Sequence, residues 1–295
     1  MAFKLNKEKF RDAVLELIRL TSAELPGDVI AAMETARDNE EPGSPAKSVL
    51  GAMLKNVVMA KADSTPICQD TGTNIHFVTI PEGLSLRKVE QAIVEATQQA
   101  TAKAFLRPNA VDSLTGKNTG DNTGVMAPYI HFEEWDEPAI KLQLALKGGG
   151  CENVSTQYKL PDSNLKAGRN LEGVYKCIID AINKAQGLGC APGVIGVGVG
   201  GDRATGMIMA KKQLFRKMGD SNPVQQLDDL EQKLLVDLNK LGIGPLGFGG
   251  KTTVLGVKIG AVHRLPASFF VSIAYMCWAD RHHEMLFTEN EVSYD

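Results

Sequence analysis

The hexapeptide Ile-Cys-Gln-Asp-Thr-Gly at residues 67–72 places a thiol, an amide and a carboxyl group in three consecutive positions. It follows Pro66, where the helical pattern of the preceding residues ends. A thiolate is a ligand for soft metals, and a nearby carboxyl group can transfer protons at the same site. The alternative for Asp70 is that it only caps a turn. The hexapeptide therefore allows two interpretations, a chemical site and an ordinary turn.

The five cysteines are the next candidates, at positions 68, 151, 177, 190 and 277. An odd, widely spaced set does not fit the disulfide framework of a small secreted domain, so we expect reduced thiols, metal ligands or both. No two form a CxxC pair, which excludes zinc-ribbon, thioredoxin-type and ferredoxin-type motifs. Cys68, Cys190 and Cys277 each lie beside turn residues at the edge of a predicted element, so a shared metal site would draw on distant segments. Cys177, within a helical pattern, is expected in the core; Cys151 is ambiguous.

Two glycine-rich stretches suggest nucleotide binding at first sight. Gly196, Gly198 and Gly201 satisfy GxGxxG, but they lie within an apolar run, and no acidic residue follows at the spacing that a dinucleotide fold requires. We therefore expect these glycines to allow close approach of another backbone. The stretch GIGPLGFGGKTT fails as a P-loop because Pro245 occupies the position of its first glycine. A turn rich in backbone amides could still bind another anion, such as a carboxylate.

Two polar turns complete the set, KNTGDNTG at 117–124 and KGGGCEN at 147–153. Both are compatible with ordinary loops, since Asn, Asp and Gly tolerate left-handed backbone conformations. Lys147 is followed by three glycines, and exposed amides beside a cation suit a carboxylate ligand.

The elements that must position these residues fall into two parts. A 3.6-residue apolar period predicts helices in FRDAVLELIRL, DVIAAMETA, SVLGAMLKNVVMA and LRKVEQAIVEATQQATAKAF. Alternation then predicts strands at 129–135 and 140–148, followed by helices at 171–186, 204–217 and 224–240 and by two late apolar strands, TTVLGVKIGAV and ASFFVSIAYM. We expect an α+β or mixed α/β fold in one domain over 1–295, with a helical part at about 1–106 packed on a mixed sheet region at about 107–295.

Composition excludes several functional classes. The chain has 295 residues, 43% of them hydrophobic and 23% charged, which is typical of a globular protein. A formal net charge of -3 argues against nucleic acid or an anionic membrane as a partner. The first twenty residues are interrupted by charges and resemble neither a signal peptide nor a membrane span. We expect a cytoplasmic protein.

Taken in order, the motifs resemble the class I fumarase and L-tartrate dehydratase family of iron-sulfur hydro-lyases. The resemblance is carried by ICQDTGT, NTGDNTG, KGGG, CAPGVIGVGVGGDRATG and CWADR, and it runs from about residue 10 to about residue 285. One-chain members of that family continue into a second catalytic domain. The sequence is therefore similar to the separate alpha subunit of a two-subunit enzyme.

The resemblance implies that Cys68, Cys190 and Cys277 hold a [4Fe-4S] cluster. Three thiolates leave one iron without a protein ligand, and such an iron can act as a Lewis acid on a 2-hydroxy acid. The resemblance assigns to Asp70 the transfer of a proton to or from the departing hydroxyl group.

Substrate-binding roles are implied for Gln69, Arg107, His263 and the amides of Gly149 and Gly150. A bidentate arginine suits a dicarboxylate, although Arg107 could equally be a surface residue. A lone histidine such as His263 is more commonly bonded to backbone in the core. His282 and His283 are expected at a solvated helix start.

The function expected from the resemblance is reversible hydration of fumarate to (S)-malate by an alpha subunit working with a beta subunit, in a homodimer of alpha or an alpha2beta2 assembly. An L(+)-tartrate dehydratase alpha subunit, converting tartrate to oxaloacetate and water, is the nearest alternative. A non-catalytic iron-sulfur redox sensor and a nucleotide-binding enzyme are further ones. The family's catalytic base and several substrate-binding basic residues belong to the second domain.

Overall fold

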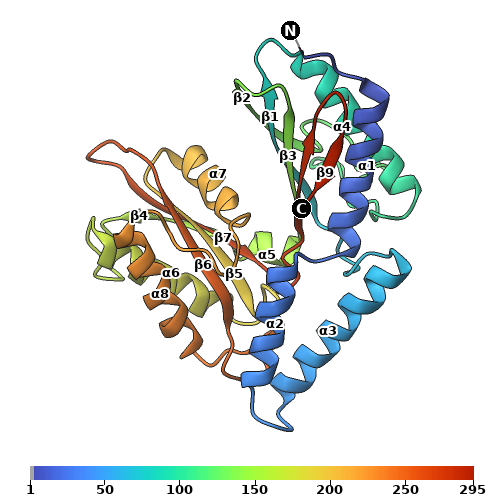
Figure 1. Cartoon of the computed structure of the whole chain (residues 1–295). Coiled ribbons are helices and arrows are strands. Elements are labelled where there is room, and N and C mark those ends of the chain that lie inside the picture. Colours follow the sequence, from blue (N-terminus) through green and yellow to red (C-terminus); the bar gives the residue numbers. More distant parts are fainter. Residues whose placement is uncertain (1–2) are drawn as a thin grey trace. The chain divides into compact units, whose positions relative to one another are not determined.

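The computed structural model describes residues 3–295, shown in Figure 1. These residues form two compact units, each made of segments distant in the sequence. Unit 1 comprises the residues up to Pro26, Asn56–Gly148 and Arg281–Asp295, and unit 2 comprises Gly27–Lys55 and Gly149–Asp280. Both units therefore draw on the predicted helical part and on the predicted mixed part of the chain.

Unit 1 is built on a five-stranded sheet with the order β2-β1-β3-β8-β9. Its strands are β1 (Thr73–Pro81), β2 (Tyr129–Trp135), β3 (Ile140–Lys147), β8 (His282–Phe287) and β9 (Val292–Tyr294). Only β1 and β2 run parallel, and the other neighbours are antiparallel. The central strand β3 thus pairs with β1 on one side and with β8, from the end of the chain, on the other.

Helices α1 (Lys7–Ala23) and α4 (Leu86–Ala102) contribute the helical half of the unit 1 core. The sheet residues Val78, Leu142 and Met285 lie in register across β1, β3 and β8 and are all buried in this core. The N-terminus of α1 is capped by Asn6, whose side-chain oxygen accepts from the Lys9 amide at 3.0 Å.

Unit 2 contains a four-stranded sheet with the order β4-β7-β5-β6. Its strands are β4 (Thr156–Leu160), β5 (Gly193–Val199), β6 (Val254–Ala261) and β7 (Phe269–Met276). Its helices are α2 (Gly27–Asn39), the first part of α3 (Pro45–Asp63), α5 (Gly149–Asn153), α6 (Leu171–Ala185), α7 (Arg203–Gln213), α8 (Gln225–Asn239) and the short η1 (Pro245–Gly247). In Figure 1, α7 lies on one face of this sheet and α6 and α8 lie on the other.

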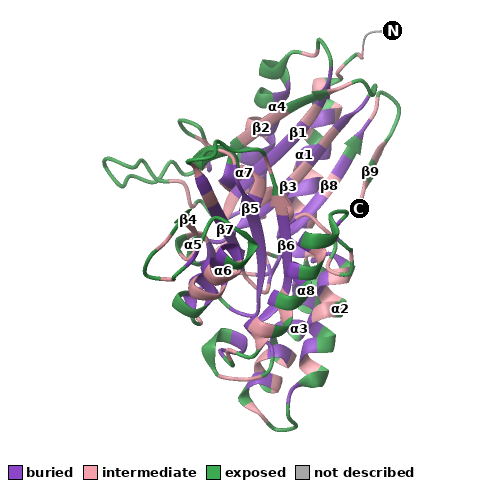
Figure 2. Cartoon of the chain, turned by 90° about the vertical axis from the view of Figure 1, so that its left-hand side faces the viewer, coloured by how far each residue is buried: buried purple, intermediate pink, exposed green. Residues whose placement is uncertain are grey.

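The glycines of β5 let α7 pack directly against the strand. A Cβ atom at Gly196 would collide with the carbonyl oxygen of Ala210, and one at Gly198 would collide with that of Gly206. All seven residues of β5 are buried, as Figure 2 shows. The predicted close approach of a backbone is therefore confirmed, and it explains Gly196 and Gly198 without a bound nucleotide.

The amide-rich turn before β6 binds a carboxylate, and that carboxylate belongs to the chain itself. Glu40, which is 3% exposed, accepts hydrogen bonds from the backbone amides of Lys251 at 2.9 Å and Thr252 at 2.9 Å. Gly250, at φ +137, lies so close to this carboxylate that a Cβ atom there would be 3.1 Å from both of its oxygens. The turn thus anchors the segment after α2 within unit 2.

The α+β fold class is confirmed, and the helices and strands predicted beyond residue 128 lie close to their predicted positions. Two predictions of local structure were wrong. Strand β1 lies inside the stretch predicted to be helical. His282 and His283 begin the buried strand β8 and do not start a solvated helix. No helix among the described residues is both long and apolar enough to cross a membrane.

Candidate active site

The hexapeptide at 67–72 is a tight turn held at both ends within unit 1. The Ile67 amide donates to the Ser22 carbonyl at 3.0 Å, and the Ile67 carbonyl accepts from the Asn56 side chain at 2.7 Å. Asp70 accepts from the Gly72 amide at 2.9 Å, so the turn-capping interpretation of this residue is realised. Gly72 has φ +83, and its Cα packs on the backbone of Lys147.

A hydrogen-bond network joins this turn to the segment that carries Arg107. The Thr71 hydroxyl, which is buried, accepts from the Arg107 amide at 3.1 Å and from the Asn109 side chain at 2.9 Å. The Asn122 side chain donates to the Arg107 carbonyl at 2.9 Å. The backbone of Arg107 is therefore fixed on both sides, while its side chain is exposed.

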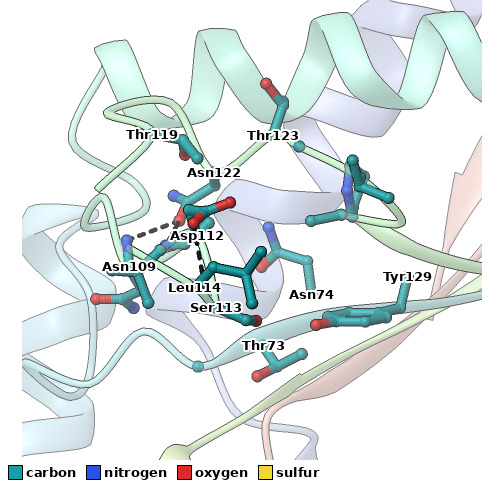
Figure 3. A pocket seen from close by; sticks show the side chains of 17 residues that line it. Thr73, Asn74, Asn109, Asp112, Ser113, Leu114, Thr119, Asn122, Thr123 and Tyr129 are labelled. Atoms are coloured by element: carbon teal, nitrogen blue, oxygen red, sulfur yellow. Dashed lines mark hydrogen bonds between the residues drawn. The ribbon is translucent and has the colours of Figure 1, made fainter. Parts of the chain in front are cut away.

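Asn122 explains why the NTGDNTG loop belongs to this region. Its side-chain oxygen accepts from the amides of Asn109 and Ala110 at 2.8 and 3.1 Å, and its side-chain nitrogen also donates to Thr101 at 2.9 Å. Figure 3 shows Asn122 beside Asn109 at a hollow of about 600 Å³. The sequence does not indicate that Thr71 and Asn122 hold these segments together, although they lie within the motifs ICQDTGT and NTGDNTG.

The KGGG motif is divided between the units. Lys147 is the last residue of β3 in unit 1 and is 1% exposed. Gly149 and Gly150 are exposed at the start of α5 in unit 2. Gly150 lies against the Leu188 carbonyl, where a Cβ atom would be 3.3 Å from the oxygen. The two glycines therefore lie close to the turn that leads into Cys190.

Cys190 and Cys277 lie side by side in unit 2. The Trp278 amide donates to the Cys190 carbonyl at 3.2 Å, which joins the turn before β5 to the residue after Cys277. Cys190 is exposed and has φ +57, a backbone conformation that is uncommon outside glycine and that concentrates at functional sites. The Cys277 thiol donates to the Ala279 carbonyl at 3.6 Å.

A buried tyrosine lies under these two cysteines. A Cβ atom at Gly189 would be 2.5 Å from the Tyr275 ring, and one at Gly193 would be 2.7 Å from the Tyr275 hydroxyl oxygen. The ring therefore fills the space beneath the turn at 189–193. Burial raises the pKa of Tyr275, and the nearby thiols of Cys277, Cys151 and Cys190 raise it further.

The remaining cysteines occupy different environments. Cys177 is fully buried in α6, and burial raises the pKa of its thiol to about 12, which confirms it as a core residue. Cys151 is 2% exposed and contributes to the unit 2 core. No disulfide joins any two of the described cysteines.

Three ligands do not gather in either unit. Among residues 3–295, no group of three or more His, Cys, Asp or Glu side chains is arranged to hold a metal ion. Unit 2 brings together two of the three predicted cluster ligands, and their thiols are of the type that binds iron-sulfur clusters. The third, Cys68, belongs to unit 1, where it is partly exposed beside Asp70.

His263 lies apart from the cysteine pair. It is exposed in the loop between β6 and β7, where the Gly201 amide donates to its carbonyl at 3.3 Å beyond the end of β5. Cys190 precedes the start of β5, and Cys277 follows the end of the antiparallel strand β7. The seven residues of β5 therefore separate His263 from the cysteines by roughly 20 Å.

Comparison with known proteins identifies the family of this chain. Residues 11–286 match the family described as fumarate hydratase (Fumerase). The chain belongs to this family. The sequence-based assignment, including the similarity to tartrate dehydratase alpha subunits, is thereby confirmed.

Three relatives show how much of each matched protein this chain covers. A Geobacillus stearothermophilus protein named as a class I fumarate hydratase is 48% identical over 277 residues, which are 93% of this chain and 54% of the relative. The chain therefore spans about half the length of that relative. The L(+)-tartrate dehydratase subunit alpha of Escherichia coli (strain K12) is 31% identical over 94% of this chain and 90% of its own length. A Methanocaldococcus jannaschii protein, whose name places it with the same subunits, is 36% identical over 92% and 95%.

Proposed function

We propose that the chain is the alpha subunit of a [4Fe-4S]-dependent hydro-lyase that reversibly adds water to fumarate to give (S)-malate. The observation that carries the proposal is the network around Thr71, because it joins the turn holding Cys68 and Asp70 to the backbone of Arg107. A thiol, a proton-transfer group and a cation for a dicarboxylate are the parts that this family's reaction requires.

The ligands proposed for the cluster are Cys68, Cys190 and Cys277. The pairing of Cys190 with Cys277 in unit 2 and the exposure of Cys190 support this assignment. When bound, the cluster would supply a Lewis acid that polarises the substrate's hydroxyl and carboxylate groups. A cytoplasmic location belongs to the same proposal, because thiols must stay reduced to serve as such ligands.

The residues of the chain would then exchange a proton with the substrate and bind its carboxylate groups. Asp70 would exchange a proton with the hydroxyl group that leaves or enters. The exposed guanidinium of Arg107 would bind a substrate carboxylate in a bidentate pair, with its backbone held by Thr71 and Asn122. Gln69 and the exposed amides at Gly149 and Gly150 would orient the same dicarboxylate.

His263 fits this assignment of roles least well. Its predicted contact with substrate stays a prediction, since within unit 2 it lies at the opposite end of the sheet from Cys190. A substitution that leaves the cluster intact, such as His263→Gln, would test it through the Michaelis constant for malate.

A tartrate dehydratase alpha subunit is the second candidate. The Escherichia coli relative of that name matches 90% of its own length, whereas the relative named as a fumarate hydratase extends well beyond the matched region. Assaying the assembled enzyme with fumarate and with tartrate separates the two. Dehydration of tartrate without any formation of malate from fumarate would reverse our choice.

The partner provides the decisive experiment for the proposal. The matched relative is roughly double in length, and the resemblance places the family's catalytic base in a second domain, outside the matched residues. Without a base the proton next to the carboxylate is not removed, however well the substrate is bound. We expect the isolated, cluster-loaded chain to show negligible malate–fumarate interconversion and to gain it on addition of a matching beta subunit.

Each result of that experiment has a clear meaning. Robust activity of the isolated chain would place the base within these 295 residues and contradict the proposed division. Stable assembly with the beta subunit but no turnover of either substrate would favour the redox sensor. The assembly itself, as a homodimer of alpha or as alpha2beta2, can be read from its mass.

A further inference from the structure

The hydroxyl group of Tyr275 is a buried polar group in unit 2 that the proposed function leaves unexplained. Tyr275 is 1% exposed, and its hydroxyl has no hydrogen-bond partner among the described residues. A buried hydroxyl without a partner is costly, by about 1–3 kcal/mol, and is uncommon in folded proteins. A strand residue in this position could be phenylalanine unless the oxygen has a use.

Two of the predicted cluster ligands lie near the Tyr275 ring. The ring lies beneath the turn at 189–193, with its hydroxyl end nearest Gly193. Cys277 is two positions further along the chain from Tyr275 and is the first residue after the end of β7. The thiols of Cys277, Cys151 and Cys190 are close enough to raise the pKa of the hydroxyl, in addition to the larger effect of its burial. Sulfur is therefore one acceptor type near the hydroxyl.

The position of Tyr275 is itself tightly determined. Its amide donates to the Ser155 hydroxyl at 3.0 Å, and the Ser155 hydroxyl donates to the Cys151 carbonyl at 2.9 Å. Glycines at 189 and 193 leave room for the ring, because a Cβ atom at either position would overlap it. The hydrogen bond to Ser155 thus fixes the backbone of Tyr275, and the two glycines leave the space that its ring occupies.

We propose that Tyr275 is a positioning residue whose hydroxyl donates a hydrogen bond to sulfur at the Cys190–Cys277 pair when these thiolates hold iron. The inference rests on the proposed function, since it assigns a role toward the same cluster. A donor to a ligating sulfur stabilises negative charge on that sulfur and so influences how firmly the iron is held and how easily the cluster is oxidised.

The test compares the wild-type chain with Tyr275→Phe after anaerobic reconstitution with iron and sulfide. Phenylalanine keeps the ring between the two glycines and removes only the oxygen. We expect equal initial iron and sulfide content, and loss of iron to a chelator about 10-fold faster in the variant. Iron–sulfur stretching bands in resonance Raman spectra should shift between water and D₂O by less in the variant than in the wild-type chain.

Two further variants of the chain complete this experiment. Tyr158→Phe is the matched control, because its hydroxyl donates to Asp180 at 2.6 Å in the same unit and should leave iron loss unchanged. Fluorotyrosine at position 275, whose hydroxyl is a stronger donor, should slow iron loss and keeps the proposal testable if the phenylalanine chain folds poorly. Equal iron loss and equal D₂O shifts in the wild-type and Tyr275→Phe chains would overturn this inference alone. A wild-type chain that binds no iron and sulfide would overturn the proposed cluster and this inference together.

Discussion

Asp70 combines a structural contact with its proposed chemical role, and the two can be separated. An asparagine oxygen can accept the Gly72 amide hydrogen bond as the carboxylate does, but an amide does not exchange protons at neutral pH. We expect Asp70→Asn to retain its iron and sulfide and to lower turnover of the assembled enzyme by about 10²-fold or more. Steady-state rates at equal cluster content measure this.

The matched control is Asp70→Ala, which removes the turn contact as well. It should lower both turnover and the midpoint of urea unfolding. Full turnover in Asp70→Asn would leave this residue with the turn contact as its only role.

His76 makes unit 1 sensitive to acid. Its ring is fully buried in β1, neither nitrogen has a partner among the described residues, and burial lowers its pKa to about 3. The unfolded ring has a pKa of about 6.5, so the folded state disfavours the proton. This contribution to stability is complete above about pH 6.5 and is lost as the pH falls toward 3. We expect the free energy of unfolding to fall by about 1 kcal/mol between pH 7.5 and pH 5.5.

The measurement can be confined to unit 1. The chain has two tryptophans, Trp135 in unit 1 and Trp278 in unit 2, so a Trp278→Phe chain reports unit 1 through Trp135 fluorescence. His76→Phe in that background should flatten the pH dependence of the urea midpoint, whereas His263→Gln should not. A slope that persists in His76→Phe would mean that other groups cause it.

Some residues of the candidate site could be selected from the sequence and others could not. Cys68, Asp70 and Arg107 lie in turns or loops, and their side chains can bind a metal, transfer a proton or bind a carboxylate, so the sequence alone identifies them as candidates. Thr71 acts through a hydrogen bond to a residue 36 positions away, which no local pattern reveals. Tyr275 lies in an apolar run, where a tyrosine resembles any other core residue.

At the scale of elements, the contact between β5 and α7 depends on the absence of side chains. A methyl group at Gly198 would meet the backbone of α7, so Gly198→Ala must displace the helix. We expect a loss of about 1–3 kcal/mol in the free energy of unfolding. Gly51→Ala in α3 is the control, since nothing lies within 4 Å of its Cβ position, and it should stabilise by about 0.5–1 kcal/mol. Equal effects of the two substitutions in urea titrations would contradict this account of β5.

The turn that binds Glu40 gives a second prediction about an element. Glutamine at position 40 would replace one acceptor oxygen by an NH₂ donor, which would face the backbone amide of Lys251 or the amides of both Lys251 and Thr252. Glu40→Gln should therefore lower the free energy of unfolding by about 1–3 kcal/mol. Glu41→Gln is the control, because Glu41 is exposed and pairs with Lys251 at the surface, and its unfolding midpoint should stay unchanged. A midpoint unchanged in Glu40→Gln would show that the turn does not need this anion.

The sequence does not predict strands β1 and β8, and the burial of their residues explains why. Strand β1 is buried on both faces over most of its length and therefore lacks the alternation that marks a half-exposed strand. Strand β8 begins with His282 and His283 and follows directly on Arg281; all three residues are buried, although such residues are more often exposed. By contrast, β3 alternates between buried and half-buried residues over its first five positions, and this alternation predicts the strand correctly.

At the scale of the whole molecule, the chain passes between the two units four times, after Pro26, Lys55, Gly148 and Asp280. The proposed cluster ligands are distributed in the same way, with Cys68 in one unit and Cys190 and Cys277 in the other. We expect neither unit to fold as a single continuous fragment. Residues 149–280 expressed without Gly27–Lys55 lack the Glu40 contact and should show no cooperative unfolding transition in Trp278 fluorescence, whereas a full chain carrying Trp135→Phe should show one.

The order of synthesis adds a consequence for unit 1. Strand β3 is complete at Lys147, but its partner β8 begins only at His282, near the end of the chain. At about 5–20 residues per second, one edge of β3 stays open for roughly ten seconds while unit 2 is being made. An open apolar strand edge is a site for pairing with other chains. Nascent chains stalled before β8 should therefore bind chaperones strongly. Pairing of β8 with β3, once the last residues have left the ribosome, should cover the open edge and reduce aggregation.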